Sequence, residues 1–146
     1  MPRWQNGSGT LRFVQTDAGE TTPANEPPPP EATTPTTPSA APSTPLAIPL
    51  EIAASYRART RGLLGRDGID GALLLTPASG VHTFRMRFPL DIAYLTRDLT
   101  VLAVRTMRPG RLGRPRLRAR HVLEAEAGAM TRWGLRPGTR LTIDTP

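Results

Sequence analysis

The chain has 146 residues, a length that suits one hydrophobic core rather than two. It contains no cysteine, which excludes disulfide scaffolds, thiolate metal sites and cysteine nucleophiles. Its 19 basic residues, all arginine, outnumber 12 acids and give a net charge of +7. Arginine pairs with phosphates and carboxylates, so this balance favours anionic partners, although a GC-rich coding bias explains the same composition.

The sequence carries no apparent membrane or export signal. No stretch approaches the roughly 20 apolar residues of a membrane span. The first residues also lack the apolar run of a signal peptide. We therefore expect a cytoplasmic protein with no membrane span.

Residues 19–45 are rich in Pro, Thr, Ser, Ala and Glu and contain no aromatic or large aliphatic side chain. Such a segment buries too little apolar surface to offset its ordering entropy, so we predict a disordered proline-rich insertion. Residues 1–18 and 46–146 are then a single β domain. This domain holds all 19 arginines against 9 acids, a net charge of +10.

Two strands are predicted on either side of the insertion. Residues 10–14 place Leu11 and Phe13 on one face, and residues 48–52 alternate apolar and other side chains. We expect these strands to pair, because a long surface connection costs little free energy. Pro49 predicts either that the second strand lies at a sheet edge or that Pro49 is the first residue of the strand.

A short helix is predicted next, over residues 56–64, with Ser55 as its N-cap and Gly65 just past its end. Apolar or alternating runs separated by Pro and Gly then predict further strands. These runs are 72–75, 81–86, 91–96, 101–106, 121–125 and 140–144. The pattern predicts a mainly β fold, a compact β-sandwich or barrel-like domain with one or two short helices.

The connection between the last two runs has its own signals. Residues 128–133 are expected to form a single helical turn that Gly134 ends. Residues 136–139, Arg-Pro-Gly-Thr, predict a type II turn with Pro second and Gly third.

The segment 81–91 holds the densest set of candidate functional residues. If extended, it would place His82, Phe84, Met86 and Phe88 on one face, and Thr83, Arg85 and Arg87 on the other. An imidazole is the side chain that ordinarily exchanges a proton near neutral pH, so His82 is the natural candidate for a general acid or base. Asp91 could orient His82 or pair with an arginine. A packed histidine and a structural ion pair are the alternatives.

Charged residues in two other segments are candidates for binding or catalysis. Arg59, Arg61 and Arg66 lie at the C-terminal end of the predicted helix, where cations complement the helix dipole and no phosphate loop is present. Glu124 and Glu126 share one face of a strand and could act as acid and base. Two carboxylates are too few ligands for a metal, so we expect no metal and no cofactor.

Seven arginines fall within sixteen residues, from Arg105 to Arg120. This loop could bind nucleic acid or another anionic surface, but no aromatic residue is interleaved to stack on a base. A solvated, mobile loop is the alternative. The anion-binding candidates are Arg108, Arg111, Arg114, Arg116 and Arg118.

Four ordered motifs resemble the family called domain of unknown function 192. They are residues 59–66, 82–92, 122–128 and 135–138, within a similar region of about 46–144. The resemblance implies a compact β-sandwich or barrel-like domain with short helices and no established function. Its recurrent polar positions correspond to Arg59, Arg61, Arg66, Met86, Asp91 and Glu124. Arg85 stands where Trp or Gly is common, and the proline-rich insertion departs from the usual pattern.

The leading functional hypothesis is a noncatalytic module that holds a small anionic or polar ligand on a concave surface. Its candidate residues are Arg61, Arg66, His82, Arg85, Met86, Asp91 and Glu124. One alternative is a hydrolase- or lyase-like enzyme that uses His82 with Asp91 or Glu124. The other is a nonspecific nucleic-acid or anionic-surface binder that acts through the Arg105 to Arg120 loop.

Overall fold

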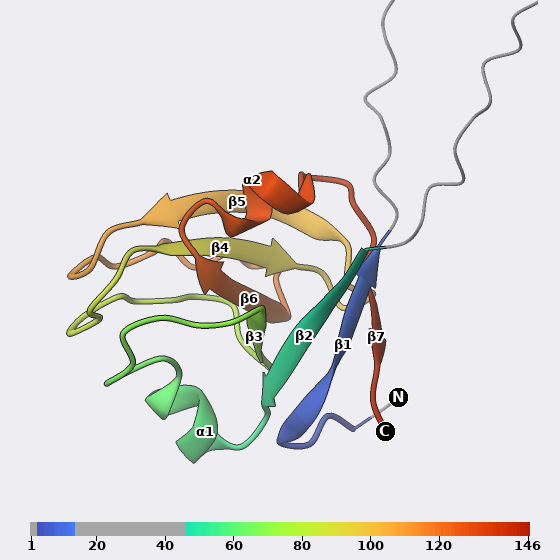
Figure 1. Cartoon of the computed structure of the whole chain (residues 1–146), viewed down its shortest axis with the longest axis horizontal. Helices are drawn as coiled ribbons and strands as arrows, with labels where there is room; N and C mark the ends of the chain where they lie inside the picture. Colours follow the sequence, from blue (N-terminus) through green and yellow to red (C-terminus); the bar gives the residue numbers. More distant parts are fainter. Residues whose placement is uncertain (1–2, 14–45) are drawn as a thin grey trace, which may run out of the picture.

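The computed structural model describes residues 3–13 and 46–146, so the predicted disordered insertion at 19–45 lies outside the described residues. The described residues form a mainly β fold with two short helices (Figure 1). In chain order the elements are β1 (Gly7–Phe13), β2 (Leu46–Ala53), α1 (Tyr56–Arg61), β3 (Ala72–Leu75), β4 (Leu90–Leu95), β5 (Val101–Met107), β6 (His121–Glu126), α2 (Ala129–Trp133) and β7 (Thr142–Asp144).

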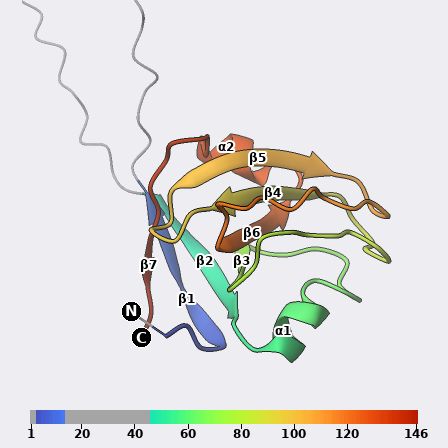
Figure 2. The same ribbon diagram turned by 180° about the vertical axis from the view of Figure 1, so that it is seen from behind.

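The strands form one mixed sheet in the order β5-β4-β6-β3-β2-β1-β7. Among the described strands only β2 and β3 pair in parallel, and the predicted pairing of β1 with β2 is confirmed. Strands β2, β1 and β7 lie together on one side of the molecule, and β4, β5 and β6 lie on the other (Figures 1 and 2). The start of β5, at one sheet edge, bonds to the segment just before β7, at the other: the amide of Val101 donates to the carbonyl of Thr139 at 2.8 Å, and the amide of Leu141 donates to the carbonyl of Leu99 at 2.9 Å. The sheet is therefore sharply curled and sandwich-like.

The position predicted for the second strand is wrong, because β2 lies between β1 and β3 rather than at an edge. Pro49 is tolerated there for a local reason. The pairing of β2 with β3 begins only at Leu50, which is opposite Ala72, so Pro49 lies outside that ladder. Its missing N–H therefore removes no hydrogen bond between β2 and β3.

The central strands are covered on both faces. All residues of β3 and β4 are buried, as are all of β6 except Glu126. One core contains Leu74, Leu123 and Met130 of α2, and the other contains Leu73, Ile92 and Leu63, which follows α1. The two helices therefore cover opposite faces of the sheet. Within residues 3–13 and 46–146, neither helix has the length and apolar character needed to cross a membrane.

The helix signals are confirmed in part. Ser55 caps α1, and its hydroxyl accepts a hydrogen bond from the amide of Ala58 at 3.1 Å. The helix ends earlier than predicted, because Gly62 adopts a φ of 46° and donates to the carbonyl of Ala58 at 2.9 Å. The short α2 ends at Gly134 as predicted.

The predicted type II turn is confirmed. The amide of Thr139 donates to the carbonyl of Arg136 at 3.1 Å, which closes the four-residue turn. Gly138, at the third position, has a φ of 91°, a conformation that this turn requires and that glycine adopts without steric cost.

The predicted strand at 81–86 is wrong. Its residues form a turn and a single isolated bridge, and Arg85 has a φ of 60°. Thr83 is fully buried and His82 and Phe84 are exposed, whereas Met86 and Phe88 are buried, so the four residues expected on one face do not share one. Thr83 points inward because its hydroxyl bonds to the main chain of the segment that follows β5.

Asp91 anchors α2 to the sheet. The carboxylate is buried, and its Oδ1 accepts a hydrogen bond from the hydroxyl of Thr106 at 2.7 Å. Its Oδ2 accepts from the amides of Gly128 at 2.9 Å and Met130 at 3.1 Å. These bonds connect β4 to β5 and to the start of α2, and none of them reaches His82 or an arginine.

We predict that Asp91→Ala lowers the free energy of unfolding by about 3 kcal/mol, because three donors lose a charged acceptor. Urea denaturation followed by circular dichroism measures the loss. Asp67→Ala is the control, since Asp67 is exposed and its one partner among the described residues is Arg87 at 3.1 Å. That surface pair is worth at most about 1 kcal/mol. Similar losses in the two variants would contradict the anchoring role.

Candidate functional site

A cavity of about 400 Å³ lies between α1, the turn after it and the segment that follows β3. Apolar side chains form much of its wall, including Leu63, Leu75, Val81 and Met86. Its polar lining residues are Arg59, Thr60, Arg61, Ser79, His82 and Glu124. A mostly apolar hollow with a few converging polar groups is the usual form of a small-ligand site.

Glu124 is the buried polar group of this cavity. It lies on β6, opposite Leu73 of β3 and Ile92 of β4, and is only 4 % exposed. Its carboxylate makes no hydrogen bond or ion pair with any described residue. Burial raises the pKa of Glu124 to about 7. The carboxyl group is therefore divided between its neutral and charged forms near physiological pH.

Two arginines of α1 face the same cavity. The guanidinium of Arg59 donates to the carbonyl of Pro77 at 2.6 Å, and so connects the helix to the segment after β3. Arg61 also lines the cavity, and it forms no ion pair within the described part of the chain. Arg57, on the same helix, does not line the cavity. Arg61 is therefore the arginine available to an anionic ligand.

His82 and Met86 line the cavity from the segment that precedes β4. The His82 ring is exposed and stacks on Phe84, with ring centroids 5.2 Å apart and planes 20° apart. The structure therefore brings together Arg61, His82, Met86 and Glu124, four of the seven predicted ligand residues.

The other three predicted ligand residues lie elsewhere. Arg66 forms a bidentate pair with Glu51, with two N–O distances of 2.9 Å. These hydrogen bonds lower the pKa of Glu51 and raise that of Arg66. Arg85 is exposed on its turn, and Asp91 is occupied by its three bonds beneath α2. None of the three lines the cavity.

The arginines after β5 form a different site. A groove of about 660 Å³ is lined by Arg105, Arg108, Arg111, Arg114 and Arg116, with Tyr94 beside them. Arg118, the remaining anion-binding candidate, is exposed outside this lining. The cavity over Glu124 and the arginine groove have no lining residue in common.

The second histidine has a packing role. His121 is buried, with its Nδ1 2.8 Å from the hydroxyl oxygen of Thr76 and its ring edge-on to Trp4 at 5.9 Å. Burial lowers the pKa of His121, so the ring is neutral near pH 7. The contact with Thr76 connects β6 to the residue that follows β3.

Sequence reasoning missed several residues of the cavity wall. Tyr56, Thr60 and Ser79 line it, and so does the backbone around Gly80. No local pattern marks these positions, because the wall exists only where α1 packs over the segment after β3. The one available signal was helical spacing, which places Thr60 one turn after Tyr56.

Two solved structures share the fold. One, from Sinorhizobium meliloti 1021, is provisionally assigned as a transcription regulator; it is 18% identical, covers 97% of this chain and 98% of its own, and has a TM-score of 0.69. The other, a protein of unknown function from Novosphingobium aromaticivorans DSM 12444, is 20% identical, covers 70% and 79%, and has a TM-score of 0.59. At these identities the likeness shows the fold alone.

No curated protein matches the chain at a significant level. A family model does match, over residues 38–143, which is most of the chain. That family is DUF192, described as Uncharacterized ACR. The chain belongs to the DUF192 family.

Proposed function

We propose that the cavity over Glu124 binds a small polar ligand that carries an anionic group. The observation that carries the proposal is Glu124 itself, a carboxyl group 4 % exposed with no partner in the described part of the chain. The carboxyl oxygens are reachable from the cavity, because the fully buried side-chain atom without a hydrogen bond in the described part of the chain is Arg116 Nε. A hydroxyl or amine of a bound ligand would supply the missing partner.

The rest of the lining matches the same kind of ligand. Arg61 can hold a carboxylate or phosphate in a bidentate manner. Leu63, Val81 and Met86 are apolar and can cover the ligand's carbon skeleton. The volume of about 400 Å³ falls in the range of small-molecule sites. The ligand we expect therefore carries an acid at one end and a hydrogen-bond donor at the other.

Acid–base catalysis is the second candidate, and the pKa of Glu124 favours it. A carboxyl group with a pKa of about 7 can both accept and donate a proton near neutral pH. His82 lies on the wall of the same cavity and could serve as the opposite partner. One experiment distinguishes binding alone from acid–base catalysis. The protein is incubated with a ligand found by screening, and the mixture is analysed by mass spectrometry. New products that disappear in Glu124→Gln indicate an enzyme, and an unchanged ligand indicates a binding module.

We predict that anionic ligands found by a thermal-shift screen bind Arg61→Ala about tenfold more weakly, because a charged hydrogen bond is lost. The screen covers phosphorylated metabolites, carboxylates and sugars, and calorimetry measures the affinities. Arg57→Ala removes the same charge from the same helix outside the cavity, so it should bind as the wild type does. A screen in which no compound shifts the melting temperature would count against the site.

We also predict a pH-dependent stability that depends on Glu124. Its folded pKa of about 7 exceeds the ordinary value of 4.5, so the folded state keeps a proton that the unfolded state has lost. Stability should therefore fall as pH rises from about 4.5 to about 7, by about 3 kcal/mol in total.

Glu124→Gln removes this titration, so the variant should be more stable than the wild type at pH 8 and similar to it at pH 4. Urea denaturation at a series of pH values measures the difference. Glu126→Gln, which removes an exposed carboxylate from the same strand, should keep the wild-type pH dependence. Parallel stability profiles for Glu124→Gln and the wild type would refute a raised pKa at Glu124.

A further inference from the structure

The backbone of the arginine-rich segment is fixed by a buried threonine. The hydroxyl of Thr83 donates to the carbonyl of Arg108 at 2.6 Å and accepts from the amide of Arg111 at 2.9 Å. The amide of Gly113 donates to the carbonyl of Val81 at 2.8 Å. A Cβ on Gly113 would lie 2.8 Å from the Tyr94 hydroxyl, so the chain packs closely there. The arginine side chains therefore extend from a backbone held by hydrogen bonds.

No carboxylate among the described residues pairs with the guanidinium groups of this segment. The three ion pairs among residues 3–13 and 46–146 involve Arg12, Arg66 and Arg87, and none involves an arginine of the groove. Arg116 lies over the Tyr94 ring at 5.0 Å, and its Nε is buried without a hydrogen-bond partner in the described chain. Unpaired positive charges held close together repel one another, and an anionic ligand would relieve that repulsion.

The turn that carries two exposed rings pairs with the arginine-rich segment through its backbone. His82 forms a β-bridge with Leu112, which lies in the middle of the arginine-rich segment. The His82 ring stacks on Phe84, which is 46 % exposed. The sequence showed no aromatic residue between the arginines, but the turn before β4, which carries two exposed rings, forms a bridge to the same segment.

We propose that this surface, the arginine platform, binds single-stranded nucleic acid. It consists of Arg105, Arg108, Arg111, Arg114 and Arg116 of the groove, together with His82 and Phe84. The arginines would contact consecutive phosphates, and an unpaired base would stack on Phe84. Cationic grooves with aromatic stacking positions are the common means of holding single strands. A duplex keeps its bases stacked on each other and cannot use the Phe84 ring.

Fluorescence anisotropy with labelled oligothymidylate, oligouridylate and a duplex of equal length tests the proposal on the full chain. We expect the single strands to bind more tightly than the duplex, with an affinity that falls steeply between about 50 and about 200 mM salt. Binding of either single strand supports the proposal, and the ratio of their affinities identifies DNA or RNA as the preferred strand. Absence of binding at about 50 mM salt, or equal binding of the duplex, overturns it.

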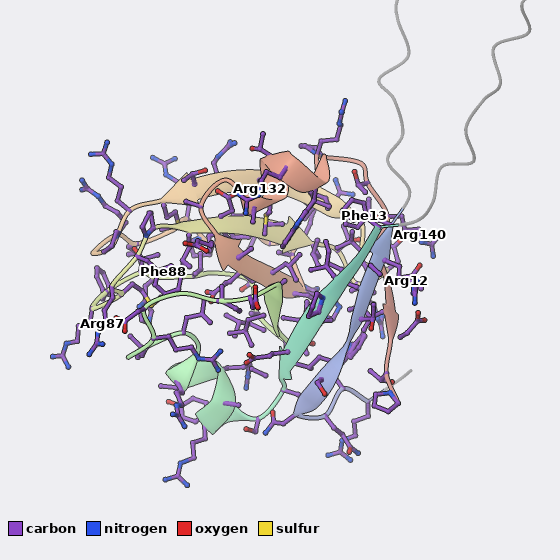
Figure 3. The ribbon with its side chains drawn as sticks, in the orientation of Figure 1. Arg12, Phe13, Arg87, Phe88, Arg132 and Arg140 are labelled. Carbon is purple, nitrogen blue, oxygen red and sulfur yellow. The ribbon has the colours of Figure 1, made fainter. Side chains whose placement is uncertain are left out.

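The double variant Arg111→Ala, Arg114→Ala tests the phosphate contacts. It should weaken single-strand binding at least about tenfold and lower the salt slope by about 2. Arg132→Ala, Arg140→Ala removes the same charge from exposed positions on α2 and just before β7, away from the end that carries Arg87 (Figure 3). This control should change the affinity less than about twofold. Equal losses in the two double variants would mean attraction by net charge alone and would overturn the proposal.

Phe84 tests the stacking contact. Phe84→Ala should weaken binding at least about fivefold, whereas Phe84→Trp should retain it. Thermal melting of each variant shows whether the fold is kept, and the Trp variant keeps the test decisive if the Ala variant unfolds. Wild-type affinity in a folded Phe84→Ala, or a loss of binding in a folded Phe84→Trp, would contradict base stacking. Arg111 and Arg114 do not line the Glu124 cavity, so the double variant leaves its wall unchanged, whereas Phe84 stacks on His82, which does line it.

Discussion

The structure depends on β6, which lies between β4 and β3 and is covered on both faces. One face packs toward α2 and the curled β1–β2 half of the sheet, and the other packs toward the segments around α1. A strand in this position should be apolar throughout. Glu124 and His121 are the buried polar exceptions on β6, and the Glu124 carboxyl group reaches a hollow in the covering layer. The burial that stabilises the sheet thus also raises the pKa of Glu124.

The covering layer on the α1 side contains almost no regular structure, and both candidate sites are built from it. Residues 76–89 and 108–120 cross this face as irregular segments that hydrogen-bond to each other through Thr83 and Val81. Irregular backbone with its own internal hydrogen bonds can place side chains where a strand could not. His82 shows this, because it lines the cavity and also stacks on the Phe84 ring of the arginine platform.

The sequence correctly predicted the strands, caps and turn that depend on a local pattern of residues. Alternation located most strands, and Ser55, Gly134 and the turn at 136–139 were correctly placed because their signals are local. The strand at 81–86 failed because Thr83 turns inward toward main-chain partners 25 and 28 residues away. For the same reason, the sequence could not show that Glu124 has no partner among the described residues. Nor could it show that the turn with His82 and Phe84 pairs with the arginine-rich segment. Alternation placed Glu124 on a strand face, but only tertiary packing left it without a partner.

The distribution of charge connects the two sites. Outside the insertion the chain has few carboxylates, and most are occupied: three pair with arginines, Asp91 holds α2, and Asp98 accepts from Thr96. The positive field of the arginine platform is therefore not neutralised from within, and it attracts anions toward the face that His82 shares with the cavity. In the proposed ligand site, the protonation of Glu124 would then favour one class of ligand over another. Below pH 7 its neutral carboxyl group tolerates an anion, whereas above pH 7 its charge opposes one and favours a cationic donor.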